Sequence, residues 1–275
     1  MNSSLPRGDR LRDLLRARPG SHVDLPDIDP RETHGRKEEA LAGLRDNVGL
    51  LASQQERLYA GARHAVLVVL QGMDTAGKDG TIKHVMTGLN PQGVIVAPFK
   101  VPTPEEAAHD FLWRVHRQTP GKGMIAIFNR SHYEQVLVVR VHGLEPEETW
   151  RRHYDQINEF ERTLAENGTT ILKFFLHISK EEQRERLQDR IDTPEKQWKF
   201  RKADVEERKL WDDYQRASED ALSRCSTEHA PWYVIPADRN WFRDYAVAEI
   251  LADTLEDLDL RYPGPEPDIK GLIVK

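Results

Sequence analysis

The chain has 275 residues, with 40 Lys and Arg against 46 Asp and Glu, which gives a formal net charge of −6. This balance excludes a generally basic nucleic-acid-binding surface, because such proteins carry a positive field over the binding domain. A mean hydropathy of −0.68, without any apolar run of roughly 18 residues, excludes a membrane span.

The first twenty residues contain several Arg and Asp and no apolar stretch, so we expect no secretory signal. The single cysteine, Cys225, excludes an internal disulfide, and no Cys and His set has the spacing of a zinc site. We therefore expect a cytoplasmic protein in which Cys225 is a thiol without a role.

The N-terminal part predicts an arm followed by a helix. Residues 1–35 are rich in Arg, Asp and Pro, and residues 36–58 place leucines and a valine at helical spacing. We expect an arm and helix over 1–58, a domain over 59–262 and a tail over 263–275.

Strand and helix signals alternate through the rest of the chain. Residues 145–167 and 203–224 carry apolar side chains at helical spacing, and capping boxes begin further helices at Thr103 and Ser179. The segment 136–142 fits either a strand or a buried helix. Short apolar runs predict buried strands over 65–70, 94–99, 124–128, 170–178 and 232–237. This alternation predicts one α/β domain with a parallel sheet.

The first predicted strand runs into a glycine-rich loop, GMDTAGKDGT (72–81), which contains the pattern G-x-x-x-x-G-K. In such a loop the backbone N–H groups surround phosphates at a helix N-terminus and the lysine binds their oxygens. The alternative is a glycine-rich turn with a surface lysine. The predicted phosphate-binding residues are Gly72, Thr75, Ala76, Gly77, Lys78, Asp79, Gly80 and Thr81.

Two carboxylates belong to this loop. Asp79 stands where a Ser or Thr usually ligates Mg²⁺, and Asp74 lies within the loop itself. Two carboxylates facing phosphates repel them unless a hard cation lies between, and Mg²⁺ is the usual cation there. We therefore expect Asp74, with Asp79 beside it, to ligate Mg²⁺; the alternative is that both only complement the helix dipole.

The strand predicted over 124–128 ends in the polar segment NRSHYE (129–134). Ligands of open α/β sheets lie beyond the carboxyl ends of strands, so this segment should face the phosphate loop. Arg130 offers a planar fork for phosphate oxygens, Asn129 stands where Walker B strands end in Asp, and Glu134 could meet an acceptor nucleotide. The alternative is an ordinary surface pair of Arg130 and Glu134.

Residues 184–216 concentrate positive charge around a proline break. Arg186 and Arg190 share a helix face, and the run KQWKFRK carries Lys196, Lys199, Arg201 and Lys202 without an anion. Cations on a segment between two helices predict a mobile cover over a phosphate site. A solvated charged hairpin is the alternative.

Together these motifs resemble the polyphosphate kinase type 2 family over about residues 35–262. The resemblance rests on GMDTAGKDG, PFKVPTPEEAAHDFLWR, FNRSHYE, RLQDRIDTPEKQWKFRKAD, ERKLWDDY and APWYVIPADRNW. It implies a P-loop kinase core, a three-layer α/β/α domain with a parallel sheet, with a helical lid over about 184–216. It also implies Mg²⁺-dependent phosphoryl transfer between inorganic polyphosphate and nucleotides, and a homo-oligomer, either a dimer or a tetramer.

The resemblance assigns roles to particular residues. Asp74, Lys78, Arg130 and Arg190 match the catalytic positions of the family, whereas Asn129 departs from a position that is often aspartate. FNRSHYE followed by VLVVRVH is similar to the subclass that accepts both AMP and ADP. On the nucleotide side we expect Lys100, Arg114, Asn129 and Glu134.

Three other functions can be weighed against this interpretation. An ATP-dependent nucleoside or nucleotide kinase would share the loop and a basic lid, but it usually has Ser or Thr at the position of Asp79. A nucleotide-binding switch would need a base-reading motif, which we do not find. A single-strand nucleic-acid reader, which KQWKFRK alone would fit, conflicts with the net charge of −6.

Overall fold

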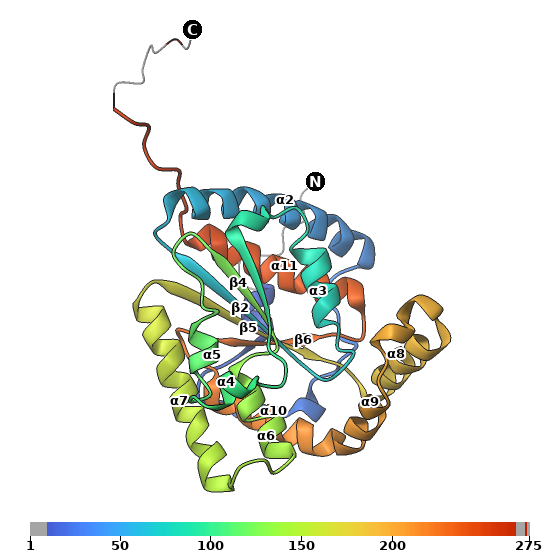
Figure 1. The fold of residues 1–275 in the computed structure, drawn as a ribbon. Coiled ribbons are helices and arrows are strands. Elements are labelled where there is room, and N and C mark those ends of the chain that lie inside the picture. Colours follow the sequence, from blue (N-terminus) through green and yellow to red (C-terminus); the bar gives the residue numbers. More distant parts are fainter. Residues whose placement is uncertain (1–9, 268–272, 274–275) are drawn as a thin grey trace.

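The five apolar runs of the sequence form neighbouring strands in a computed structural model, which describes residues 10–267 and 273 (Figure 1). The described residues form a six-stranded sheet in the order β1-β6-β5-β2-β4-β3. The strands are β1 (Arg16–Ala17), β2 (Ala65–Gln71), β3 (Val94–Pro98), β4 (Ile125–Asn129), β5 (Thr169–His177) and β6 (Trp232–Pro236). Strands β2 to β6 are parallel where they pair, so the predicted parallel sheet is confirmed.

The central strand β2 is buried on both faces of the sheet. Val66, Val68 and Leu70 pack into one apolar cluster, whereas Leu67 and Val69 pack into the other. Because successive side chains of a strand point to opposite faces, a continuous apolar run requires a layer of helices on each side. The three-layer α/β/α architecture follows from this pattern.

Helices cover the two faces of the sheet as that burial requires (Figure 1). On one face lie α2 (Lys37–Gly61), α3 (Lys78–Val85) and α11 (Asn240–Asp257), with the short α1 (Leu11–Leu14). On the other face lie α5 (Trp113–His116), α6 (Val138–Val141), α7 (Glu147–Glu166) and α10 (Trp211–Cys225). The helix expected over 36–58 is α2, and the ambiguous segment 136–142 contains the helix α6 and no strand.

The arm and the segment 203–224 differ from what the sequence predicts. Arg16 and Ala17 form the edge strand β1, which pairs antiparallel with β6. A strand of two residues is too short to show a recognisable sequence pattern. The single helix expected over 203–224 is divided into α9 (Lys202–Glu207), the 3-10 turn η5 (Arg208–Leu210) and α10. Residues 1–9 of the predicted arm, and 268–272 with 274–275 of the predicted tail, lie outside the described residues.

The remaining segments connect these layers. They are η1 (Leu25–Asp27), η2 (Pro91–Gly93), α4 (Pro104–Ala107), η3 (His132–Gln135), α8 (Lys180–Asp192) and η4 (Pro194–Lys199). Both predicted helix starts are present: Thr103 completes a capping box with Glu106, and the Ser179 side chain accepts a hydrogen bond from the Glu182 N–H. Within the part of the chain that the structure describes, no helix is long and apolar enough to cross a membrane.

Candidate active site

The phosphate loop joins the end of β2 to the first residue of α3, Lys78. Gly72 and Gly77 both have positive φ, at 145° and 109°. A Cβ at Gly72 would lie 2.6 Å from the Leu176 carbonyl oxygen, and one at Gly77 would lie 1.9 Å from Arg243 Nη1. Only glycine fits at these two positions, so the loop conformation explains both glycines of the motif.

Lys78 is buried, and its side chain is hydrogen-bonded to the backbone of the phosphate loop that precedes it. Its Nζ donates to the carbonyl oxygens of Gly72 at 2.7 Å and Met73 at 3.2 Å. Burial, together with the nearby positive charge of Arg130, lowers the pKa of Lys78 to about 8. A phosphate next to the Lys78 Nζ would stabilise the positive charge of the lysine, so the loop favours an anionic ligand.

The segment after β4 meets this loop because β4 and β2 are parallel neighbours, with Asn129 opposite Leu70. Arg130 Nη2 lies 2.7 Å from Asp74 Oδ1, and Arg130 Nη1 lies 3.3 Å from Glu134 Oε2. Gln71 Nε2 also donates to Glu134 Oε1 at 3.1 Å. Arg130 has a φ of 61°, the left-handed region, which is uncommon for a residue with a Cβ and occurs often at functional sites.

The two loop carboxylates, Asp74 and Asp79, are the predicted metal ligands. Asp74 Oδ1 is bonded to Arg130, and Asp79 Oδ1 accepts a hydrogen bond from Asn129 Nδ2 at 2.7 Å. Among the described residues no group of three or more His, Cys, Asp or Glu side chains could hold a metal. A cation here would therefore need phosphate oxygens as well, which is how Mg²⁺ is commonly bound.

Some predicted loop residues face away from a ligand. The Thr81 side chain is fully buried, and its hydroxyl donates to Asp244 Oδ1 at 3.4 Å. The Thr81 N–H bonds to the Gly77 carbonyl within the helix. Arg243, which the sequence analysis missed, is also buried and donates to Asn240 Oδ1 at 2.6 Å and to Asp244. Arg243 and Asp244 support the loop from the side of α11, and no motif in the sequence marks these two residues.

Lys100 lies in the loop after β3, and Arg114 lies in α5. Arg114 Nη1 and Nη2 both donate to the Lys100 carbonyl oxygen at 2.9 Å, and Nη1 lies 3.2 Å from Glu106 Oε2. The guanidinium thus holds the backbone that follows β3. No hydrogen bond in the described residues joins either side chain to the phosphate loop.

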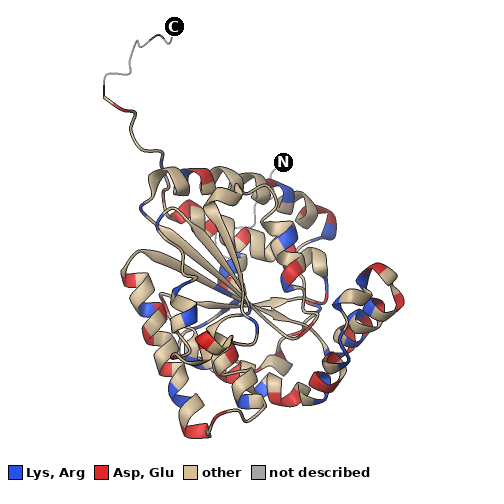
Figure 2. Ribbon diagram, viewed as in Figure 1, with Lys and Arg blue, Asp and Glu red and all other residues tan. Residues whose placement is uncertain are grey.

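The segment predicted as a lid contains most of α8, together with η4 and α9, and it projects from the carboxyl end of β5 (Figure 2). Arg190 Nη1 donates to the Lys199 carbonyl at 3.3 Å and lies 3.7 Å from Asp204 Oδ2. Lys196 is paired with Asp189 at 2.6 Å. Acidic residues of the lid therefore partner some of its cations, which the anion-free run KQWKFRK did not reveal.

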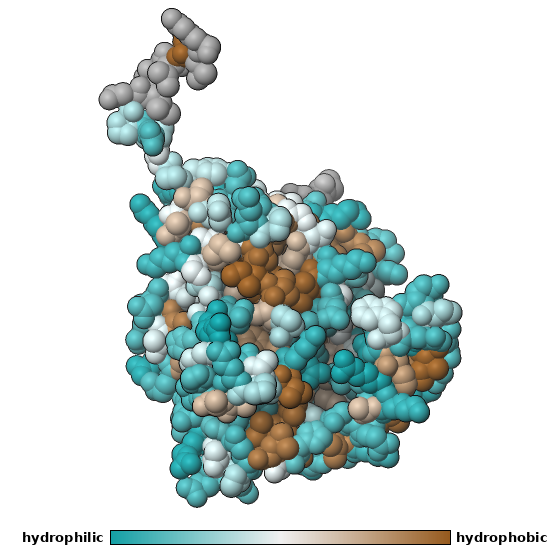
Figure 3. All heavy atoms as spheres, viewed as in Figure 1, coloured by the Kyte–Doolittle hydropathy of each residue, from teal (hydrophilic) through white to brown (hydrophobic). Residues whose placement is uncertain are grey.

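The other lid cations are exposed or bound within the lid. Lys199 Nζ lies 5.0 Å from the centre of the Trp198 ring, whereas Arg201 and Lys202 lie at the start of α9. Ile191 and Val205 are also exposed, and Figure 3 shows an apolar patch within the largely hydrophilic lid.

Asp204 of α9 and Tyr214 of α10 are both influenced by the charge of Asp74 in the phosphate loop. Burial raises the pKa of Asp204, and the charge of Asp74 adds to this effect. Burial, the hydrogen bond to Glu207 and the charges of Glu134 and Asp74 raise the pKa of Tyr214 far above its usual value. Tyr214, on α10, thus belongs to the surroundings of Arg130, although its sequence position indicated only helix packing.

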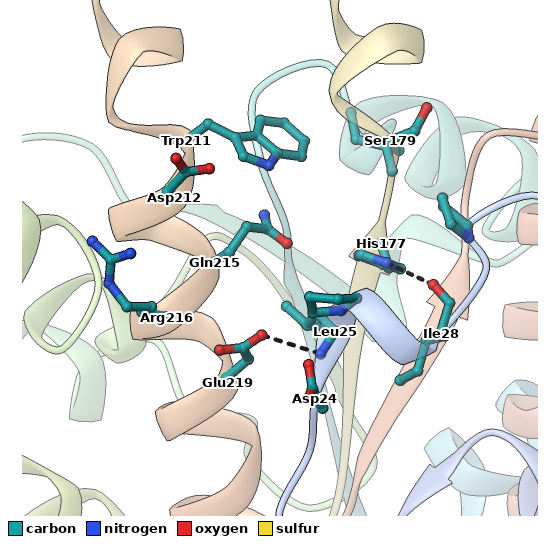
Figure 4. Close-up of a pocket in the computed structure, with 13 residues that line it drawn as sticks. Asp24, Leu25, Ile28, His177, Ser179, Trp211, Asp212, Gln215, Arg216 and Glu219 are labelled. Carbon is teal, nitrogen blue, oxygen red and sulfur yellow. Dashed lines mark hydrogen bonds between the residues drawn. The ribbon is translucent and has the colours of Figure 1, made fainter.

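A pocket of about 440 Å³ lies elsewhere, between the N-terminal arm, the end of β5 and α10 (Figure 4). His177 Nε2 donates to the Ile28 carbonyl at 3.1 Å, and the Leu25 N–H donates to Glu219 Oε1 at 3.2 Å. None of the predicted site residues lines this pocket. The candidate active site is therefore the polar edge formed by the loop, the segment after β4 and the lid.

Comparisons with known proteins identify the family of this chain. A family model described as Polyphosphate kinase 2 (PPK2) matches residues 34–263. An "AMP/ADP-polyphosphate phosphotransferase" of Meiothermus ruber is 55% identical over 263 residues, 94% of this chain and 98% of that protein. An "ADP-polyphosphate phosphotransferase" of Rhodopseudomonas palustris is 47% identical, covering 90% of this chain and 91% of that protein. A crystal structure of Polyphosphate Kinase 2 from Arthrobacter aurescens TC1 has a TM-score of 0.92 at 42% identity and covers 98% of this chain and 97% of that one.

Proposed function

This chain belongs to the polyphosphate kinase 2 family, and from that membership we propose that it transfers phosphoryl groups between inorganic polyphosphate and nucleotides. AMP and ADP are the proposed acceptors, giving ADP and ATP, and the transfer is reversible. The relatives named for polyphosphate and for AMP or ADP support this substrate class. The observation that carries the proposal is the contact of 2.7 Å between Arg130 and Asp74, which joins the segment after β4 to the phosphate loop.

The proposed chemistry is positioning and charge neutralisation. The acceptor's terminal phosphate oxygens are ionised near neutral pH, so the step needs little general-base assistance. Phosphoryl transfer passes through a loose transition state whose charge is spread over equatorial oxygens. Lys78 and the loop N–H groups would hold the phosphates, and Arg130 would stabilise the transferred group. Arg190 would reach the same group from the lid after releasing Asp204.

Mg²⁺ is the proposed cofactor, held by Asp74 with Asp79 beside it. When bound, such an ion would supply positive charge that offsets the negative charge of the phosphates. Each of the two carboxylates bonds one protein side chain through its Oδ1, to Arg130 or to Asn129. The exposed lid cations Lys199, Arg201 and Lys202 are proposed to line the path of the polyphosphate chain. The lid is proposed to extend over about 184–216, within a phosphotransferase domain over 59–262.

A cytoplasmic location and a homo-oligomer, either a dimer or a tetramer, complete the proposal. The family resemblance supports an assembly, and light scattering of the purified chain would measure its mass.

The function is tested by incubating the full chain with polyphosphate, Mg²⁺ and either AMP or ADP, in the absence of ATP. Chromatography should then show ADP from AMP and ATP from ADP. The matched control is Lys78→Met, which keeps a long side chain and removes the charge. Absence of product from wild-type protein, combined with transfer when ATP is the donor, would instead assign an ATP-dependent nucleotide kinase.

A further inference from the structure

Side chains of α8 hold the outer side of the phosphate loop. Gln183 Nε2 donates to the Asp74 carbonyl oxygen at 3.2 Å. Arg186 Nη1 donates to the carbonyl oxygens of Thr75 at 2.9 Å and Ala76 at 3.2 Å. In a planar trans peptide the N–H points away from the carbonyl. Holding these carbonyls outward therefore turns the N–H groups of Thr75 and Gly77 to the opposite side, where a phosphate would bind.

Arg186 uses its whole guanidinium inside the protein. Besides the two loop carbonyls, Nη2 donates to the carbonyl oxygens of Ala237 at 2.7 Å and Asp238 at 2.9 Å. Nε donates to Glu182 Oε1 at 2.7 Å. Every N–H of the side chain is thus bonded, which leaves none for a ligand. Arg186 therefore joins α8, the phosphate loop and the turn between β6 and α11.

Arg190 follows Arg186 by one helical turn and lies on the same face of α8. Among the described residues, its guanidinium has polar contacts at the Lys199 carbonyl and at Asp204, both within the lid. Since the helix between the two arginines is continuous, the contacts of Arg186 determine where Arg190 stands relative to the loop.

The other end of the lid is attached to the same place. Arg208, in η5, donates from Nη1 to Gln183 Oε1 at 2.9 Å and to the Lys180 carbonyl at 2.6 Å. Across the described part of the chain, no hydrogen bond joins residues 191–206 to the loop 72–78. Both ends of the lid are therefore fixed, and the segment between them is the part that can move.

We propose that Arg186 is a positioning residue for phosphoryl transfer, which fixes the first turns of α8 on the phosphate loop and so places Arg190 at the transferred phosphate. The inference rests on the proposed function. It also narrows the proposed moving part of the lid from about 184–216 to about 191–206, because Glu207 is bonded to Tyr214 of α10.

A double-mutant cycle with Arg186→Lys and Arg190→Ala tests this role. The lysine keeps the charge but cannot reach all of these carbonyls, so kcat should fall about ten- to hundredfold in the otherwise wild-type chain. In the Arg190→Ala background the same change should lower kcat by less than about twofold, because Arg186 acts through Arg190. Equal losses in the two backgrounds would overturn the proposal.

The matched control is Arg184→Lys on the same helix. Arg184 is exposed and paired with Glu181 across the surface, away from the loop. Its replacement should leave kcat at the wild-type value. A loss comparable to that of Arg186→Lys would show that any basic residue of α8 matters, which contradicts the proposal.

Hydrogen exchange of the full chain without substrate separates this proposal from the proposed function. Peptides over 72–77 should exchange faster in Arg186→Lys than in wild type and in Arg184→Lys. Unchanged exchange there would overturn the positioning role of Arg186 even if transfer from polyphosphate is observed. Failure of wild-type transfer would refute only the proposed phosphotransferase function. If Arg186→Lys does not fold, Gln183→Met replaces it, because Gln183 bonds the Asp74 carbonyl of the same loop. Faster exchange of the Thr75 amide is then expected, and unchanged exchange would refute the proposal that α8 fixes the loop.

Discussion

The surroundings of Lys78 disfavour the charged form of its side chain when no anion is bound. Its pKa is lowered to about 8 by burial and by Arg130. Between this value and the ordinary lysine pKa of about 10.4, the unfolded chain binds more protons than the folded chain. The contribution of Lys78 therefore destabilises the fold below pH about 8, and this cost is relieved as the pH rises toward about 10.4.

Phosphate binding has the opposite dependence on pH. Because the anion favours the charged lysine, affinity for polyphosphate should fall as the pH rises through about 8, by up to about tenfold per pH unit. Equilibrium titration of polyphosphate between about pH 7 and 9.5 measures this fall. Lys78→Arg keeps its charge over that range and should show a flat profile. A wild-type affinity that stays constant across pH 8 would contradict the assignment.

Replacement of Lys78 by methionine removes the charge and retains the length of the side chain. We expect kcat to fall by about a hundredfold or more, since one preorganised donor to a developing charge is commonly worth that much. The fold should persist, because methionine suits a buried site better than a lysine whose charge is disfavoured there. Steady-state kinetics and a thermal unfolding curve check both statements. Wild-type turnover in this variant would remove Lys78 from the mechanism.

At this scale the sequence predicts what is carried by a local pattern. The loop from Gly72 to Lys78 and the segment around Arg130 could be found because a strand and a known spacing precede them. The roles of Arg243 and Gln183 could not be predicted from the sequence, because each side chain bonds the loop from a helix that is remote in sequence. Their contacts with the phosphate loop form only in the folded chain, where the strand order of the sheet brings these segments together.

Among the elements, the segment after β4 depends on a buried ionic network. Glu161 of α7 pairs with Lys173 of β5, and both side chains are fully buried. Lys173 Nζ also donates to Tyr133 Oη at 2.7 Å, and His132 lies 3.1 Å from Glu161. Burial opposes the charge of Glu161, but Lys173 and His132 outweigh it and lower the pKa of that carboxyl. The network thus holds the turn that presents Arg130.

Glu161→Gln should leave the Lys173 charge buried without its partner. We expect a loss of about 3–5 kcal/mol in the free energy of unfolding, the usual cost of breaking a buried pair. Denaturant unfolding followed by circular dichroism measures it. The double variant Glu161→Leu with Lys173→Met should recover most of the loss, because no unpaired charge remains. A cost below about 1 kcal/mol for Glu161→Gln would show that the pair does not hold this segment.

The elements also show where periodicity is informative. The strands buried on both faces were predictable because continuous apolar runs of this length have few other solutions. The break at 208–210 was not, since Leu210 and Tyr214 keep helical spacing across it. There Arg208 bonds to the start of α8, a tertiary contact that a pattern along the chain does not contain.

The whole molecule is acidic, yet its proposed substrate is a polyanion. Attraction must therefore come from a few cations in one region, namely Lys78, Arg130, Arg190 and the lid residues 196–202. Such focused attraction is screened by salt. We expect the KM for polyphosphate to rise by about tenfold between ~0.05 and ~0.5 M salt, with kcat nearly constant. Kinetics at several salt concentrations check this.

Two lid lysines provide the matched comparison. Neutralising Lys199 and Lys202 to glutamine should raise KM at low salt and flatten the salt dependence. Lys122→Gln is the control, because Lys122 precedes β4 and lies at the opposite end of the strand from the site. An equal effect of the control would mean that general surface charge, and not the lid, attracts the substrate.

The choice of phosphoryl donor distinguishes a polyphosphate-dependent enzyme from an ATP-dependent kinase. The measurement compares kcat/KM for polyphosphate and for ATP as donors to AMP, with Mg²⁺ and the full chain. We expect polyphosphate to support ADP formation without any ATP and to be the better donor. Transfer from ATP alone, with polyphosphate inert, would contradict it.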